Sequence, residues 1–156
     1  MDIFNFAKKT FAPCTVEQIN QIETELGFAF PSWYVNFLSI SNGAHFEYGS
    51  VGEGFLPFLG FSSLEEALSS FEEVKGLGIF PFGSCDGQAI TGFEIDTNNI
   101  FYVSIELYEK HFLSDSIEGF LQVYERESFI YNLQVKAELG EITLEEYHRQ
   151  LASRKP

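Results

Sequence analysis

The sequence has few cysteines, no long apolar run and no recognisable targeting segment. Its two cysteines are Cys14 and Cys85, whereas small secreted domains usually contain several disulfides. A membrane-spanning helix needs about 18 or more apolar residues in succession, and no such run occurs. The first residues, MDIFNFAKKT, lack the charged and apolar regions of a signal peptide. We therefore expect a cytoplasmic protein that does not enter a membrane.

Basic residues are scarce where acidic residues are dense. The 156 residues include 23 Asp and Glu against 9 Lys and Arg, which gives a formal net charge of -14. Residues 10–109 contain 14 of these acids and a single base, Lys75. Phosphate backbones are bound by Lys and Arg, so this shortage argues against direct binding of nucleic acid. The charge favours a basic protein as partner, with high solubility as the alternative explanation.

The sequence also lacks the short motifs of phosphate, calcium and zinc sites. Residues 83–87, GSCDG, match the thiol form of a nucleophile elbow, but that motif needs a helix after the turn and QAITGFEI predicts a strand. Glu145 and His148 give one half of a di-iron motif that requires two copies. We expect no catalytic residue, no metal and no cofactor. A thiol hydrolase that uses Cys85 is the enzymatic alternative.

Aromatic residues, by contrast, are abundant, with 18 Phe among the 45% of residues that are hydrophobic. A domain of this length buries roughly 70% of the surface of its unfolded chain, so we expect one core and a single domain over residues 1–156. In the stretch 27–43, GFAFPSWYVNFLSISNG, the glycine, the proline and the Asn-Gly pair are typical of helix boundaries. The spacing of its aromatics predicts a core rather than a ligand pocket. Trp33 is the exception, expected to be partly exposed.

Helices are predicted by capping boxes followed by apolar residues three and four apart. A first helix begins after Thr15 and ends at Gly27, and a second runs from Pro31 to Asn42. A third opens with the capping box at residues 63–66. A fourth begins near Ser116, and two further helical stretches are expected around Gly140, the second opening with the capping box at residues 143–146.

Strands are predicted between the second and fourth helices, on both sides of the third. Residues 44–54 are Gly-rich and expected to form a loop, and residues 55–61 to form a strand with Pro57 at a sheet edge. Three strands follow, GIFPFG, AITGFEI and IFYVSIEL, and the turn DTNN at residues 96–99 joins the last two as a hairpin. His111 is expected in a loop beyond them. The order predicts an α+β fold, with a mostly antiparallel central sheet flanked by N-terminal and C-terminal helices.

The run from Thr15 to Gly43 carries a family resemblance. It consists of an acidic helix ending in Leu-Gly, an apolar-Pro pair, an aromatic, an apolar pair and Asn-Gly. This pattern resembles the opening signature of the SUKH superfamily, whose founding members are the Smi/Knr proteins of yeast cell-wall regulation. Later segments follow in family order, so the resemblance covers a core of about residues 14–125, and residues 126–156 would form a C-terminal helical extension. The matching positions are Leu26, Gly27, Phe30, Pro31, Tyr34, Phe37, Leu38, Asn42 and Gly43.

The resemblance implies a protein that acts by binding. Most bacterial members resemble immunity proteins that bind a cognate toxin domain, often a nuclease, and block it without chemistry. Eukaryotic members are more similar to regulatory scaffolds, which is the alternative. The acidic body of the chain fits the first role, because nucleases are often basic around the groove that holds a phosphate backbone.

The residues expected to contact the partner come from loops and strand ends, with Trp33 as a possible aromatic anchor. Acids would steer and pair with a basic toxin domain, and aromatics would supply affinity at the centre of the contact. Neither the identity of the toxin nor the oligomeric state follows from the sequence. The predicted partner-binding residues are Trp33, Glu47, Tyr48, Glu53, Asp86, Asp96 and Tyr102.

Overall fold

An antiparallel sheet of seven strands runs through the molecule in chain order, from β1 at one edge to β7 at the other. The computed structural model of the chain describes residues 2–52, 56–84 and 88–154. Each strand pairs with the next one in sequence, and all the described pairings are antiparallel. The strands are β1 (Ala7–Thr10), β2 (Ala44–Ser50), β3 (Pro57–Phe61), β4 (Ile79–Ser84), β5 (Ala89–Glu94), β6 (Ile100–Ser104) and β7 (Glu109–Ser114).

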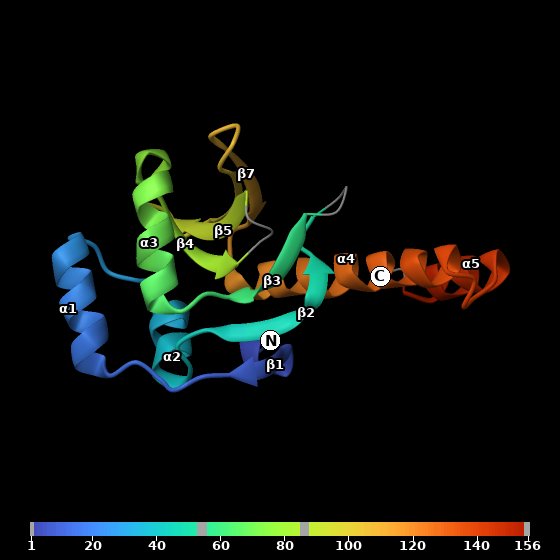
Figure 1. Cartoon of the computed structure of the whole chain (residues 1–156), viewed down its shortest axis with the longest axis horizontal. Helices are drawn as coiled ribbons and strands as arrows, with labels where there is room; N and C mark the ends of the chain where they lie inside the picture. Colours follow the sequence, from blue (N-terminus) through green and yellow to red (C-terminus); the bar gives the residue numbers. More distant parts are fainter. Residues whose placement is uncertain (1, 53–55, 85–87, 155–156) are drawn as a thin grey trace.

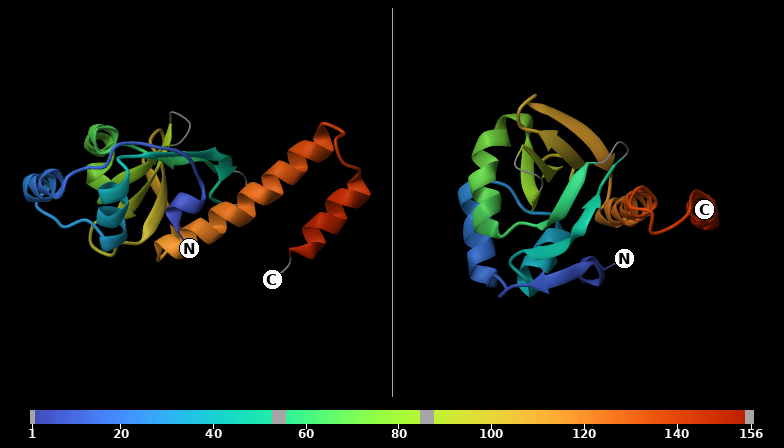
Figure 2. Two further views of the ribbon diagram at one scale, coloured as in Figure 1. Left: turned by 90° about the horizontal axis from the view of Figure 1, so that it is seen from below. Right: turned by 45° about the vertical axis from the view of Figure 1, so that its right-hand side comes forward.

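The helices gather at two ends of this sheet (Figure 1). At one end lie α1 (Val16–Leu26), α2 (Ser32–Ile40) and α3 (Leu64–Val74). Helix α4 (Ile117–Glu138) packs against β2 and β7 and then extends past the sheet. Figure 2 shows that α5 turns back and runs alongside the outer part of α4. The α+β class and the flanking helices that the sequence predicts are therefore confirmed. The helices are η1 (Ile3–Asn5), α1 (Val16–Leu26), α2 (Ser32–Ile40), α3 (Leu64–Val74), η2 (Lys75–Leu77), α4 (Ile117–Glu138) and α5 (Leu144–Ser153).

The helix boundaries follow the predicted capping signals closely. Thr15 and Gln18 form a reciprocal capping box at the start of α1, and Gly27 ends that helix with a left-handed φ of 81°. Ser63 and Glu66 form the same box at the start of α3. The predicted hairpin is also present, since β5 and β6 are joined by a tight turn in which Asn98 has a φ of 63°.

Four features differ from the prediction. Residues 44–50 form strand β2 rather than a loop, and His111 lies in strand β7 rather than beyond the last strand. Pro57 begins β3, which is an inner strand; its described pairing with β4 starts only at Gly60, so the missing N–H of Pro57 does not interrupt that pairing. One continuous helix, α4, replaces two of the three predicted helical stretches.

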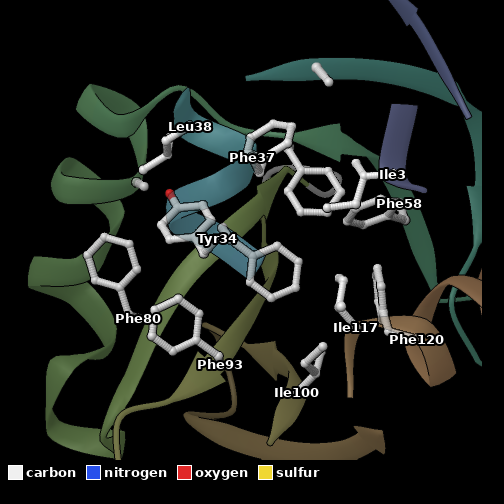
Figure 3. Close-up of a cluster of buried hydrophobic side chains, with 14 of the residues drawn as sticks. Ile3, Tyr34, Phe37, Leu38, Phe58, Phe80, Phe93, Ile100, Ile117 and Phe120 are labelled. Atoms are coloured by element: carbon white, nitrogen blue, oxygen red, sulfur yellow. The ribbon is translucent and has the colours of Figure 1, made fainter. Parts of the chain in front are cut away.

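The core lies between the sheet and the helices and is dominated by aromatic rings (Figure 3). Tyr34, Phe80 and Phe93 are fully buried, and the Tyr34 and Phe93 rings meet at 5.6 Å between centroids. Such edge-to-face pairs contribute roughly 0.5–1.5 kcal/mol each beyond the burial of their area. Within residues 27–43 the buried side chains include Phe30 and Phe37. That stretch is core, as its spacing predicts.

Candidate partner-binding surface

The chemical alternatives to a binding protein depend on metal-ligating side chains and on the two cysteines. Among the described residues, no group of three or more His, Cys, Asp or Glu side chains is placed to hold a metal ion. The Cys14 thiol is 8% exposed, and burial, with a smaller effect of Glu65, raises its pKa. A nucleophilic cysteine needs the opposite, a lowered pKa and access. Cys85, on which the hydrolase alternative depends, lies outside the described residues.

Of the helices formed by the described residues, none combines the length and apolar character of a membrane span.

Six exposed acids lie on α1 and α3, two helices side by side at one end of the molecule (Figures 1 and 2). We call the exposed acids of these two helices the acidic face. The only base in either helix or in the η2 turn that follows is Lys75, and its ammonium is 2.7 Å from the carboxylate of Glu72. The acidic face therefore presents negative charge with little local compensation. Its members are Glu17, Glu25, Glu65, Glu66, Glu72 and Glu73.

Glu65 is the best-positioned carboxylate of this face. It lies in the first turn of α3, where the helix dipole favours an anion, and its side chain accepts a 3.0 Å hydrogen bond from the amide of Asn42. A backbone N–H and this amide hold the pKa of Glu65 below its usual value. The carboxylate is consequently charged throughout the neutral range.

A second polar surface forms where β2 bulges away from β3. Between the pairs His45–Gly60 and Gly49–Phe58, residues 46–48 of β2 stand against Leu59 alone. This excess leaves Glu47 and Tyr48 exposed.

Contacts around this bulge connect it to α4 and β1. The Tyr124 hydroxyl donates a 2.7 Å hydrogen bond to the backbone oxygen of Glu47, whose carboxylate is 3.0 Å from the ammonium of Lys8. Tyr48 packs edge-to-face on Tyr131 of α4, at 6.3 Å between centroids. A cleft of about 240 Å³ lies beside the bulge, between β1 and α4, and Arg154 reaches it from the end of α5. Its charges are mixed, in contrast to the acidic face.

Among the predicted contact residues that the structure describes, Glu47 and Tyr48 lie together on the exposed bulge of β2. Asp96 is exposed, but it lies in the turn between β5 and β6. Trp33 is partly buried and packs edge-to-face on Phe82 at 5.1 Å, so most of its ring serves the core.

Of the three further predicted contact residues, one is buried and two lie outside the described residues. Tyr102 is 8% exposed and therefore offers little area to a partner. Glu53 and Asp86 lie outside the described residues. The acids of α3 are not among the residues that the sequence predicts as contacts. The signal that would have found them is the density of acids with a single nearby base.

Comparison with known families settles the relationship that the opening signature suggests. A model of the SMI1 / KNR4 family (SUKH-1) matches residues 13–123, and the chain belongs to this family. A comparison with curated proteins gave no match. The matched region ends within α4, so the outer part of α4 and all of α5 lie beyond it.

The residues of the family signature build the fold rather than a contact surface. Tyr34, Phe37 and Leu38 are at most 1% exposed. Asn42 bridges α2 to α3, because its side-chain oxygen accepts a 2.7 Å hydrogen bond from the backbone N–H of Leu64. The signature residues therefore account for the core and its capping, and they leave surfaces such as the acidic face unassigned.

Proposed function

We propose that this protein binds a basic partner through its acidic face and acts without chemistry, as an immunity protein that neutralises a cognate toxin domain. The observation that carries the proposal is the concentration of six acids on α1 and α3 with Lys75 as their only local base. A one-signed surface accelerates encounter with a surface of opposite sign and suppresses the wrong partners. Basic nucleases are the toxins that suit it best, and the proposal places their encounter in the cytoplasm.

The experiment is calorimetric titration with the toxin domain encoded beside the gene of this protein, at 20 and 150 mM salt. We expect tight binding that weakens as salt rises, because exposed charges farther apart than about 8–10 Å are largely screened at the higher salt. A folded toxin domain that does not bind at either salt would overturn the immunity proposal in favour of the regulatory scaffold.

Charge-reversal variants locate the contact. Glu17→Lys combined with Glu73→Lys reverses two acids of the acidic face, and we expect it to slow association by about tenfold or more. The matched control is Glu138→Lys with Glu141→Lys, which changes the net charge equally at two exposed positions of the α4–α5 hairpin. Equal slowing by the two double variants would show that net charge, and not the acidic face, steers the partner.

A further inference from the structure

A groove between α1 and α3 runs through the acidic face. It has a volume of about 190 Å³ and is lined by apolar side chains below and polar side chains above. Its floor is formed by buried Cys14 and Leu64 together with partly buried Ile22 and Leu68. Its rim is formed by exposed Gln18, Gln21, Glu25 and Glu65.

The chemistry of this groove matches a long basic side chain. Lys and Arg carry an apolar stem of three or four methylenes that covers apolar surface, and a cationic head that remains near polar groups. In this groove the stem would contact Ile22, Leu64 and Leu68, and the head would reach Glu25 and Glu65. An apolar ligand would leave the negative charge of the two carboxylates uncompensated, and a carboxylate ligand would be repelled by them.

Both rim carboxylates are held in place by hydrogen bonds. The side-chain amide of Gln21 donates to Glu25 at 3.0 Å along α1, and the amide of Asn42 donates to Glu65 at 3.0 Å. Fixed carboxylates lower the entropic cost of pairing with a cation, because the protein side of the contact is already ordered.

A second and independent observation lies directly below the floor. The Tyr34 hydroxyl is fully buried, and it is the one buried side-chain polar atom of the described residues that has no hydrogen-bond partner. Figure 3 shows this hydroxyl on the side of the ring that faces Leu38 and α3. Leu38 in turn accepts a 2.9 Å hydrogen bond from the backbone N–H of Cys14, a floor residue.

Such an unsatisfied hydroxyl lowers stability, because it has lost its hydrogen bonds to water and gained none in the protein. Native structures keep few groups of this kind, and they tend to occur at functional or strained sites. The hydroxyl is enclosed by the core and does not line the groove, so a side chain in the groove does not contact it.

We infer that the α1–α3 groove is a receptor for a single lysine or arginine side chain of a basic partner protein. The inference deepens the proposed function and rests on it for the identity of the partner. The groove itself is testable without any toxin, because a short peptide presents the same side chain.

The test is a titration of the isotopically labelled protein, followed by NMR, with the blocked tripeptide acetyl-Gly-Lys-Gly-amide. Binding on the order of millimolar is expected for one side chain. The backbone signals of residues 14–25 and 64–68 should move, and those of α4 and α5 should not. The matched ligand carries norleucine, which keeps the apolar stem and lacks the charge. Equal shifts with both peptides, or no shifts in the groove, would overturn the inference.

Substitutions in the protein complete the design. Glu25→Gln removes one rim charge and should weaken the lysine peptide about fivefold, whereas Glu17→Gln on the same helix lies outside the groove and should change binding little. Tyr34→Phe should raise the melting temperature by removing the unsatisfied hydroxyl. Because that hydroxyl does not line the groove, the affinity for the peptide should stay nearly unchanged.

The groove and the proposed function fail separately. A toxin complex that forms tightly and is insensitive to Glu25→Gln would overturn the groove while the immunity proposal stands. A peptide that binds the groove, with a toxin domain that does not bind, would overturn the immunity proposal while the groove stands.

Discussion

At the scale of single residues, the side chain of Asn42 makes two hydrogen bonds to the start of α3. It follows the C-terminal end of α2, its oxygen accepts the N–H of Leu64 in the first turn of α3, and its amide holds Glu65. The first N–H groups of a helix have no partner inside the helix, so an external acceptor is worth about 1 kcal/mol. The Asn of the Asn-Gly pair in the family signature is thus explained by capping across a chain separation of 22 residues.

Asn42→Ala should therefore lower the free energy of unfolding by about 1–2 kcal/mol. The loss combines an uncapped N–H at Leu64 with the lost amide contact to Glu65. Urea denaturation followed by circular dichroism measures it. Asn36→Ala is the matched control, because Asn36 is an exposed position inside α2 where alanine is the better helix former. Equal destabilisation by the two variants would contradict the capping role.

At the scale of elements, prediction from sequence succeeded where a local signal marks a boundary. Capping residues such as Thr15 and Ser63, and the turn at residues 96–99, specify their structures through hydrogen bonds between near neighbours. Long-range pairing gives no such local signal. Strand β1 has three exposed residues of four, and β7 has four exposed residues of six, so neither shows the alternation that reveals a half-buried strand.

The candidate site was less predictable than the fold for a related reason. Glu47 and Tyr48 were expected in a loop, and they are exposed because β2 has a bulge, which depends on its partner β3. The groove between α1 and α3 joins residues about 40 positions apart, such as Gln21 and Glu65. Periodicity within each helix shows which side chains are solvated, but it does not show which helix lies opposite. The packing of the two helices determines that.

The N-terminal turn of α3 should make stability depend on pH through Glu65. Its folded-state pKa is lowered by a backbone N–H and by Asn42, so the charged form is preferentially stabilised in the folded protein. This contribution is present above the unfolded pKa of about 4.5 and is lost as the pH falls through the folded pKa. Glu65→Gln should cost about 0.5 kcal/mol at pH 7 and almost nothing at pH 3.

Urea denaturation at pH 7, 5 and 3 measures this difference between the two proteins. Glu73→Gln serves as the control, since Glu73 lies in the last turn of α3, where a negative charge opposes the helix dipole. That variant should be neutral or slightly stabilising at pH 7. A cost of Glu65→Gln that persists unchanged at pH 3 would mean that packing, and not charge, accounts for it.

At the scale of the whole molecule, the bases are distributed unevenly. Lys8 and Lys9 lie on β1 and Lys110 lies on β7, which are the two edge strands of the sheet. Charged side chains, lysine above all, discourage edge strands from pairing with other chains. The bases of the sheet therefore protect its edges, while the acidic face on α1 and α3 has Lys75 alone. The end of the molecule formed by α1 and α3 therefore has the negative charge that the proposed binding of a basic partner requires.

The shortage of bases on the acidic face should reduce stability in the absence of a partner, because like charges on α1 and α3 repel one another. Raising NaCl from 20 to 300 mM shortens the range of this repulsion to less than 10 Å. We expect the melting temperature to rise by about 2–4 °C, which corresponds to roughly 1 kcal/mol in a protein of this size.

Glu17→Lys with Glu73→Lys should raise the melting temperature at low salt and reduce the increase that salt produces. Glu138→Lys with Glu141→Lys should leave most of that increase in place, since the α4–α5 hairpin also contains Arg126, Lys136 and Arg149. Thermal unfolding of the three proteins at both salt concentrations distinguishes repulsion within the acidic face from a general effect of salt, in which case all three would respond alike.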